Sequence, residues 1–282
     1  MHHPDDARIR HRQIETLLEH GWQVTYAAPF RGYGIDPAGQ VRPGLRVLNV
    51  ARSAGRRRLR ALRAARRLLK ARAHEFDLVL LHDPELLISF MGSGATNVVL
   101  DVHEDPAAAI EAKEWIPRLM RGPIFSTVRA FEGWAEKRMP LLLAEYRYQD
   151  RFRDTHPVVP NAVRVPAKRP KPGSERVVYL GALTVERGAQ EVVEVARALS
   201  EIPGADFSVE VIGQAHGQAE QIIRQAHLDG DVVWHGFVPS DRALPMLDGA
   251  LVGLSLLHDM PNYRHSMPTK ILEYMAHGVP VI

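Results

Sequence analysis

Short blocks rich in Val and Leu alternate with stretches of helical periodicity along almost the whole chain of 282 residues. This alternation is typical of a parallel sheet whose strands are joined by crossover helices. In the first half the predicted strands are 22–28, 45–50, 77–81, 97–102 and 140–145, and the predicted helices are 7–20, 56–74, 106–120 and 123–138, with a short helix from residue 84. In the second half the predicted strands are 176–180, 207–212, 232–235 and 250–256, and the predicted helices are 188–201, 216–227, 240–248 and 268–277. The sequence therefore predicts an α/β protein.

A change in composition divides this pattern into two domains. Residues 157–173 hold five prolines and four cations with little apolar periodicity, which is typical of a linker. We expect a first Rossmann-like domain at 1–158, a linker at 159–173 and a second Rossmann-like domain at 174–282. The chain starts at a helix with no strand before it and stops at 279–282 inside a strand pattern, so we expect a fragment truncated at both ends.

Composition excludes several classes of protein. There is no cysteine, which removes disulfides, thiolate metal sites and thiol nucleophiles. No apolar run reaches the ~20 residues of a membrane span, and the N-terminus has no signal-peptide pattern, so we expect a cytoplasmic protein. The net charge is only +3, and ten of the 36 Lys and Arg fall in residues 52–72. A basic surface of the kind that binds nucleic acid is therefore not expected.

The cationic run Arg56–Lys70 has two interpretations. Leu59, Leu62, Ala65 and Leu69 recur at helical spacing, so the run can be a helix that packs on the sheet. Its dense cations also suit peripheral attachment to an anionic membrane, at about 1 kcal/mol per cation near the surface. Both interpretations stay open.

A first candidate site in the second domain follows its first strand. A glycine turn at Gly181 leads to Arg187 and Gly188 at the start of a helix. Gly181 lets a ligand approach the backbone, Arg187 is a permanent cation, and the helix start offers N–H groups. The arrangement is that of a phosphate site, although a plain strand-to-helix turn with a solvated arginine also fits.

A second candidate lies at residues 262–278. Pro268 suits the first turn of a helix and Gly278 its end. Lys270 would then lie beside the unpaired N–H groups, where a cation and the helix dipole together can hold a diphosphate. Glu273 lies one turn further and suits a ribose diol. The alternative is an ordinary surface pair of Lys270 with Glu273.

These two segments resemble the donor-binding half of the family 4 retaining glycosyltransferases, in the GT-B superfamily. Arg187 stands where that family has a phosphate-binding lysine, and Glu273 where it has a ribose-binding glutamate. Two positions depart from the family pattern: Ala182 replaces an arginine, and His265 replaces the first glutamate of the Glu-x7-Glu motif. The resemblance implies a GT-B fold of two Rossmann-like domains facing a cleft that holds the donor.

The resemblance also implies roles for individual residues. In the first domain the segments 4–9, 81–86 and 101–105 fit it, and His103, with His82 second, is the candidate that reaches the donor sugar. In the second domain, loop backbone around Gly236 and Phe237 would contact the base. The implied catalytic residues are Arg187, Lys270 and His103. The implied nucleotide-sugar-binding residues are Gly181, Arg187, Gly236, Phe237, His265, Ser266, Met267, Pro268, Thr269, Lys270 and Glu273.

The implied activity is transfer of a hexosyl group from a nucleotide sugar, as co-substrate, to a saccharide or lipid-linked acceptor in surface glycan synthesis. No nucleophilic carboxylate is evident, and retaining members are thought to react by same-face attack, with cations stabilising the departing diphosphate. No cofactor and no metal are expected, because the histidines lack zinc spacing and Asp229-Gly-Asp231 is interpreted as a turn. Two alternatives remain: a GT-B sugar-nucleotide epimerase or hydrolase, and a non-catalytic fragment that binds a membrane or protein partner.

Overall fold

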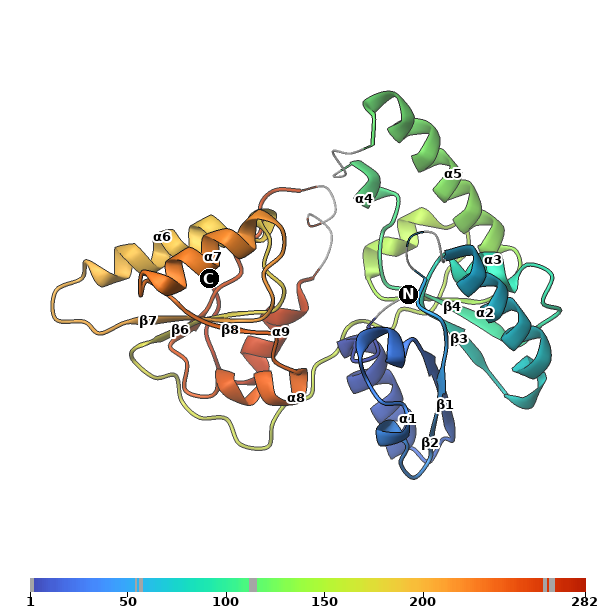
Figure 1. Ribbon diagram of the computed structural model, residues 1–282, viewed down its shortest axis with the longest axis horizontal. Coiled ribbons are helices and arrows are strands. Elements are labelled where there is room, and N and C mark those ends of the chain that lie inside the picture. The colour runs from blue at the N-terminus through green and yellow to red at the C-terminus, as the bar shows by residue number, and fades with distance from the viewer. Residues whose placement is uncertain (1–2, 54, 56–57, 112–115, 261–262, 264–266) are drawn as a thin grey trace. The chain divides into compact units, whose positions relative to one another are not determined.

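The protein folds into two compact units, Met1–Asn161 and Ala162–Ile282 (Figure 1). The computed structural model describes residues 3–53, 55, 58–111, 116–260, 263 and 267–282. The predicted linker, 159–173, lies across the division between the units.

The first part of unit 1 is a two-stranded parallel sheet with a helical segment before it. Strand β1 (Val24–Ala28) pairs with β2 (Leu45–Asn49). The chain enters through η1 (Ala7–Ile14), a π-helical stretch that continues as α1 (Glu15–Glu19), and two short turns follow β1, η2 (Phe30–Tyr33) and η3 (Ala38–Gln40). The carboxylate of Asp6 caps η1 by accepting the N–H groups of Arg8 and Ile9 at 2.9 and 3.0 Å. Apolar side chains of η1 pack on the strands in one small core.

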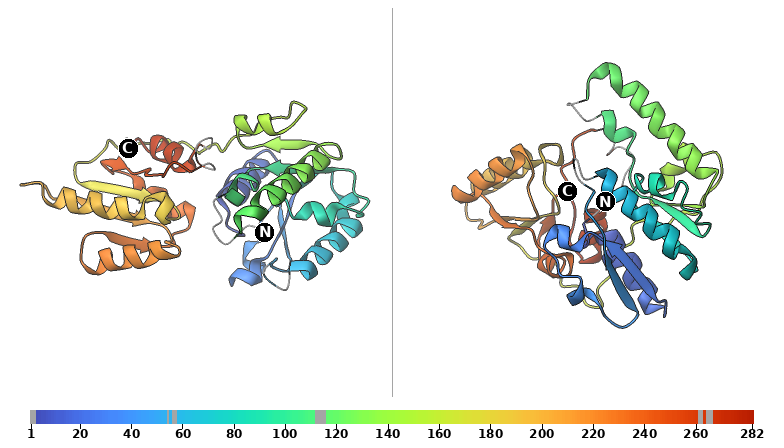
Figure 2. Two further views of the ribbon diagram at one scale, coloured as in Figure 1. Left: turned by 90° about the horizontal axis from the view of Figure 1, so that it is seen from above. Right: turned by 45° about the vertical axis from the view of Figure 1, so that its right-hand side comes forward.

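The second part of unit 1 is a separate sheet of three parallel strands in the order β3-β4-β5. Its strands are β3 (Val79–Leu81), β4 (Val98–Val102) and β5 (Leu141–Leu143), and its helices are α2 (Arg58–Arg72), α3 (Leu86–Phe90), α4 (Ala108–Glu111) and α5 (Arg118–Glu136), with the short turns η5 (Ala73–Glu75) and η6 (Tyr146–Arg151). Figures 1 and 2 show the β1–β2 pair apart from this sheet. The strand positions agree with the sequence pattern to within a few residues. Among the described residues, however, no strand joins the two sheets.

The helix boundary predicted near residues 120–123 is wrong. The break falls earlier, at Pro117, whose extended backbone (φ −53°, ψ 136°) precedes the first residue of α5. Pro123 lies inside α5. A proline inside a helix removes one backbone hydrogen bond. Helix α5 nevertheless continues because its inner face packs into the core of the β3–β5 sheet, with Ala135 fully buried.

Unit 2 is a four-stranded parallel sheet in the order β8-β7-β6-β9. Its strands are β6 (Arg176–Leu180), β7 (Ser208–Ile212), β8 (Val233–Gly236) and β9 (Val252–Gly253), and its helices are α6 (Ala189–Ser200), α7 (Gln218–Leu228), α8 (Ser240–Ala243) and α9 (Thr269–Ala276), with the turns η7 (Val185–Arg187) and η8 (Pro245–Leu247). Helices α6 and α7 cover one face of the sheet, and α8 and α9 cover the other (Figure 1).

The alternation of side chains along β6 explains this three-layer arrangement. Val177 and Tyr179 point into the core beneath α6 and α7, whereas Val178 and Leu180 point into the core beneath α8 and α9. All four are nearly fully buried, as expected for a central strand covered on both faces. Strand β9 is shorter than the predicted 250–256. At Gly253 a Cβ atom would lie 2.5 Å from the ring of Tyr274, so the α9 side chain packs directly on the strand backbone.

Candidate functional site

The carboxyl ends of β6 and β9 form the switch point of the unit 2 sheet. The chain leaves β6 towards β7 and β8 on one side, while β9 pairs on the other side. In open parallel sheets ligands bind at such a point, because the loops and helix N-termini that follow the two strands converge there. Here those helices are α6, which follows Gly188, and α9, which follows Pro268. The two predicted segments are therefore brought to one place.

Close backbone packing at this point requires glycine at two positions. A Cβ atom on Gly188 would lie 2.5 Å from both the Cβ and the carbonyl oxygen of Leu256, and one on Gly213 would lie 2.1 Å from the carbonyl oxygen of Gly181. Both residues also have positive φ angles, +90° and +150°. Side chains at either position would force the loops of β6, β7 and β9 apart.

Lys270, in the first turn of α9, is a buried cation. Its Nζ lies 3.5 Å from the centroid of the Tyr179 ring, and among the described residues it has no hydrogen-bond partner. Burial, together with the nearby charge of Arg187, lowers the pKa of Lys270 to about 7, and the charge of Glu273 partly opposes this shift. The aromatic ring face compensates only part of the lost hydration.

Arg187 is the second cation at this site. Its Nε donates to the Tyr263 hydroxyl and its Nη1 to the carbonyl oxygen of Ala182, each at 3.3 Å. In the part of the chain that the structure describes, no carboxylate forms an ion pair with it. Two neighbouring cations at the starts of α6 and α9 form a site suited to a phosphate or diphosphate.

The other predicted donor-site residues of unit 2 lie at the end of β8 and at the start of α9. Gly236 ends β8, and Phe237 follows it with 54% of its surface exposed. Met267 is exposed, Pro268 caps α9, Thr269 is its first residue, and Glu273 lies one turn after Lys270. His265 and Ser266 lie outside the described residues.

Unit 1 contains a buried network centred on the Asp101 carboxylate. The Arg8 guanidinium donates to it twice, at 2.9 and 2.7 Å, and Gln13 donates at 2.9 Å. The Nδ1 of His82 lies 3.1 Å from the Asp101 Oδ2, and the Nδ1 of His103 lies 3.1 Å from the Asp101 backbone oxygen. Because carboxylate and carbonyl oxygens only accept, Nδ1 carries a proton in both rings, and Nε2 is the acceptor in each neutral ring.

This network sets the ionisation of Asp101. Burial by itself raises the pKa of Asp101, but the hydrogen bonds from Arg8 and His82 and the charge of Arg8 outweigh that effect. The net result is a pKa well below the usual range, so Asp101 stays ionised.

The side chains of His82, Asp101 and His103 have the composition of a metal site. One potential ligand atom from each lies within 4.8 Å of the others. The Asp101 oxygens, however, already accept hydrogen bonds from Arg8, Gln13 and His82. The guanidinium thus takes the place that a cation would occupy, and the geometry favours a hydrogen-bond network over an ion site. Asp229 and Asp231 flank Gly230, whose φ of +83° is that of a turn, as predicted.

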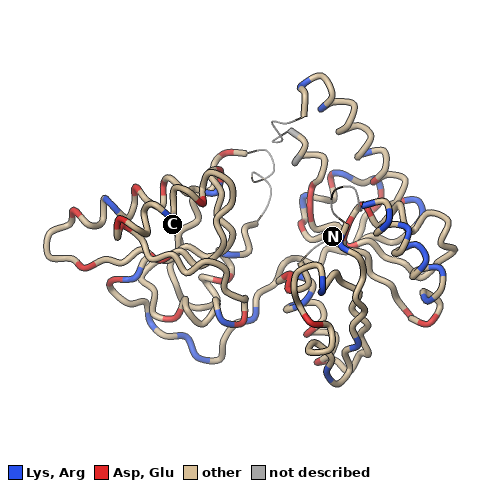
Figure 3. The backbone as a smooth tube through the Cα atoms, in the orientation of Figure 1, with Lys and Arg blue, Asp and Glu red and all other residues tan. Residues whose placement is uncertain are grey.

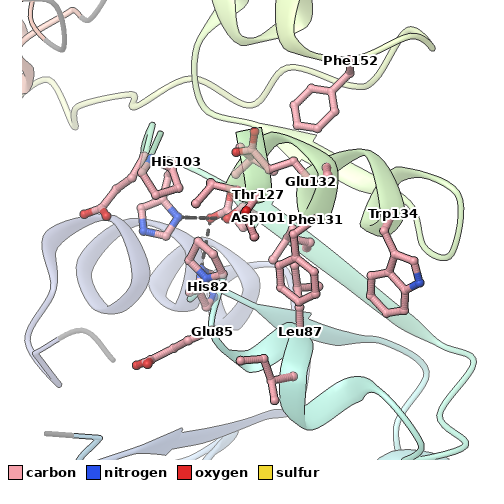
Figure 4. A pocket seen from close by; sticks show the side chains of 18 residues that line it. His82, Glu85, Leu87, Asp101, His103, Thr127, Phe131, Glu132, Trp134 and Phe152 are labelled. Atoms are coloured by element: carbon pink, nitrogen blue, oxygen red, sulfur yellow. Dashed lines mark hydrogen bonds and ion pairs between the residues drawn. The ribbon is translucent and has the colours of Figure 1, made fainter. Parts of the chain in front are cut away.

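A cavity of about 640 Å³ adjoins the two histidines (Figure 4). Its wall is formed by the ends of β3 and β4, by α3 and by α5. The sequence did not predict this cavity, because its lining residues come from segments up to 70 positions apart, from His82 to Phe152.

Several residues of both sites were not singled out from the sequence. Arg8 and Asp101 lie in the segments 4–9 and 101–105, which carried the resemblance, but only their pairing across 93 positions reveals their role. Tyr179 precedes Gly181 in the phosphate-site segment, and the ordinary interpretation of a tyrosine in a buried strand is core packing. Tyr263 carried no signal of its own.

Residues 174–282 match the family model described as Glycosyl transferases group 1. No curated protein matches the chain.

Several solved structures share its fold at low identity. The chain is similar to the sucrose-phosphate synthase (tll1590) from Thermosynechococcus elongatus, with a TM-score of 0.69 and 16% identity, covering 98% of this chain and 75% of that one. It is similar to WaaG, a glycosyltransferase involved in lipopolysaccharide biosynthesis, with a TM-score of 0.59 and 16% identity, covering 95% and 74%. It is similar to Anabaena Alr3699/HepE in complex with UDP and glucose, with a TM-score of 0.57 and 15% identity, covering 84% and 67%.

The chain spans only 44% of TarM, another structure of similar fold (TM-score 0.57, 11% identity, 78% of this chain covered). The protein therefore has the GT-B fold of two Rossmann-like units, and its residues 174–282 carry the sequence pattern of glycosyl transferases group 1.

Proposed function

We propose that this protein is a glycosyltransferase that moves a hexosyl group from a nucleotide sugar to a saccharide or lipid-linked acceptor, with retention of anomeric configuration and without a metal ion. The observation that carries the proposal is the pair Lys270 and Arg187. Two adjacent cations lie at the switch point of a parallel sheet, and one of them is buried with no hydrogen-bond partner among the described residues. Such a pair is costly in the free protein and becomes favourable when a diphosphate lies between the charges.

The proposed donor position follows from this pair. The diphosphate would lie against Lys270, Arg187 and the N-termini of α6 and α9, whose first N–H groups lack partners within the helix. Glu273, one turn along α9, would accept hydrogen bonds from the ribose hydroxyls. The HepE structure holds UDP and glucose, which agrees with a uridine nucleotide as the first donor to test.

The proposed reaction is a same-face displacement. The bond between the anomeric carbon and the diphosphate oxygen breaks, and the acceptor oxygen bonds to that carbon on the same face. The departing diphosphate oxygen takes the proton of the acceptor hydroxyl. Negative charge grows on the diphosphate, and Lys270 and Arg187 would stabilise it; one such interaction is worth on the order of 10²–10³ in kcat. His103 would bind a hydroxyl of the donor sugar through Nε2.

The proposal includes surface glycan synthesis at an anionic membrane. WaaG acts in lipopolysaccharide biosynthesis. Cations of Arg56–Lys70 would attract such a surface, although Arg56 and Arg57 lie outside the described residues. No described helix has the length and hydropathy to span a bilayer.

The first test is calorimetric titration of UDP, GDP and ADP into the protein and into two variants. Lys270→Met removes the buried charge, and Lys171→Met removes an exposed charge of the same unit as a matched control. We expect one nucleotide to bind, binding to weaken at least ten-fold in Lys270→Met, and Lys171→Met to behave as wild type. If none of the three nucleotides binds, the proposal is contradicted.

A second test measures turnover with a panel of nucleotide sugars. Arg187→Ala should lower kcat by about 10²-fold, because it removes charge stabilisation that is needed most in the transition state. Consumption of the donor at the same rate with and without acceptor would indicate an epimerase or hydrolase instead.

A further inference from the structure

The cavity of unit 1 combines a polar end with an apolar body. Figure 4 shows His82 and His103 on one side of it, and Phe131 and Trp134 on the other. Phe131 and Trp134 are stacked, with ring centroids 5.6 Å apart and planes 6° from parallel. Both rings are only partly buried, so they keep apolar surface that a ligand can cover.

Three of the four carboxylates that line the cavity are paired with arginines, and one of these three is Glu85, which pairs with Arg58 at 3.1 Å. Asp101 is paired with Arg8, and Glu132 is paired with Arg129 at 2.8 Å and also with Arg151. The described lining residues include no lysine and no arginine. A phosphate or diphosphate would therefore find no cation in this cavity, in contrast to the site at Lys270.

The size of the cavity and the exposure of its wall indicate a sizeable apolar ligand. Ile88, which lines it, has 43% of its surface exposed. At about 30 Å³ for each water-sized group, 640 Å³ holds on the order of 20 non-hydrogen atoms. This volume falls within the range of ordinary ligand pockets, about 300–1,000 Å³, which are mostly apolar with a few polar groups that fix orientation.

We propose that this cavity binds the apolar aglycone of the acceptor, so that the substrate is an amphipathic hydroxyl compound and not a purely polar saccharide. The term acceptor rests on the proposed function; the cavity's preference for an apolar group does not. The aglycone would cover Phe131, Trp134 and Ile88, and its attached sugar or hydroxyl would lie beside His82. The Nδ1 of His82 is hydrogen-bonded to Asp101, so its Nε2 can accept a hydrogen bond from such a hydroxyl.

The test compares three β-glucosides by calorimetry with the full chain: methyl, octyl and p-nitrophenyl, the octyl compound below its micelle concentration. We expect at least one of the two large glucosides to bind ten-fold or more tightly than the methyl one. Stronger binding of octyl indicates an aliphatic aglycone, and stronger binding of p-nitrophenyl indicates an aromatic one. Equal affinities for all three glucosides overturn the inference.

Two pairs of variants locate the binding. Ala130→Trp fills the cavity, whereas Ser126→Trp places the same side chain one turn away on α5, outside the lining. Ile88→Asn makes the wall polar, and Leu119→Asn makes the same kind of change at a residue that is 92% exposed and outside the lining. We expect the preference for the large glucosides to be lost in the first member of each pair and kept in the second. If Ala130→Trp does not fold by circular dichroism, Ile88→Asn decides, and retention of the preference there contradicts the inference.

Binding of UDP in the same samples separates this inference from the proposed function. If UDP binds and no glucoside preference exists, the inference alone fails. If the preference exists and no nucleotide binds, the transferase proposal fails, and the cavity stands as a binding site for apolar glycosides.

Discussion

Lys270 has its Nζ buried above the ring of Tyr179, with Arg187 close enough to repel it. The pKa of about 7 lies far below the usual value for lysine, so the free protein populates the neutral form near neutral pH. A bound diphosphate favours the charged form, because an anion next to a lysine raises its pKa. If a nucleotide diphosphate binds here as we propose, its binding is therefore coupled to protonation of Lys270.

This coupling predicts how affinity depends on pH. Below about pH 7 Lys270 is already protonated, so its own titration changes the affinity little. As the pH rises above about 7, binding must take up a proton, and the affinity should fall by up to about ten-fold per pH unit. Calorimetry of the nucleotide between about pH 6.5 and 9, in buffers that differ in ionisation enthalpy, measures both the affinity and the proton uptake.

Lys270→Arg is the matched variant, because arginine stays charged across this range. It should bind the nucleotide without proton uptake. A wild-type affinity that is flat above pH 7, or a slope that persists in Lys270→Arg, would assign the titration to another group. In the free wild-type protein the unfolded chain binds the extra proton between about pH 7 and 10.5, so the lysine's contribution to the unfolding free energy rises with pH across that window.

A buried ion pair connects the two sheets of unit 1, which no strand joins in the part of the chain that the structure describes. Arg8 comes from η1, which packs on the β1–β2 pair, and Asp101 comes from β4 of the other sheet. Arg8 also donates to Asn161 and to the Val159 carbonyl oxygen, at 2.9 and 3.0 Å. One guanidinium thus connects η1, β4 and the end of unit 1.

The losses of stability caused by removing Arg8 and Asp101 should therefore not be additive. Arg8→Met leaves the Asp101 carboxylate buried without its cation, which costs about 3–5 kcal/mol, and Asp101→Leu should cost a similar amount. The double variant should lose clearly less stability than the sum of the two single variants, as measured by urea denaturation. The control is Arg42→Met, which removes the more exposed Arg42–Glu15 ion pair beside the β1–β2 sheet. It should cost about 1 kcal/mol or less. Additive losses would show that Arg8 and Asp101 are not coupled.

Charge is unevenly distributed over the whole molecule. The net charge is +3, yet Figure 3 shows cations repeated along the length of α2. Some of these cations have local partners: Arg58 pairs with Glu85, Arg66 donates to the Ile88 carbonyl oxygen and Arg72 pairs with Glu75. Ala61 and Leu62 are buried on the inner face of α2. The helix therefore packs on the protein, as the first interpretation of the cationic run predicted. The outer face remains strongly cationic.

The membrane interpretation predicts salt-dependent binding to anionic vesicles. Replacement of Arg60, Arg63 and Arg67 by glutamine should abolish most co-sedimentation with phosphatidylserine vesicles at about 0.1 M salt, at roughly 1 kcal/mol per cation. The matched control replaces Lys168, Arg169 and Lys171, three exposed cations of unit 2, by glutamine. Equal loss in both triple variants would indicate a general charge effect, and no binding by the wild type would leave α2 as a packing helix only.

Local sequence determined most of the elements and the two cations of the candidate site in unit 2. The apolar strand blocks and the helical periodicities act over a few residues, so they placed β6, α6 and α9 within one or two positions. The same is true of Arg187 and Lys270, because a glycine turn, a proline at a helix start and a nearby cation are neighbours along the chain.

Tertiary structure decided which of these elements meet. The division of unit 1 into two sheets depends on strand pairing, and the continuation of α5 through Pro123 depends on the core that its inner face covers. The Arg8–Asp101 pair and the cavity beside His82 join residues that lie far apart in the chain. The lowered pKa of Lys270 likewise needs Tyr179 and Arg187 around it. Periodicity and turn chemistry report on neighbours in sequence, whereas burial and long-range pairing exist only once the chain has folded, and these set the chemistry of both sites.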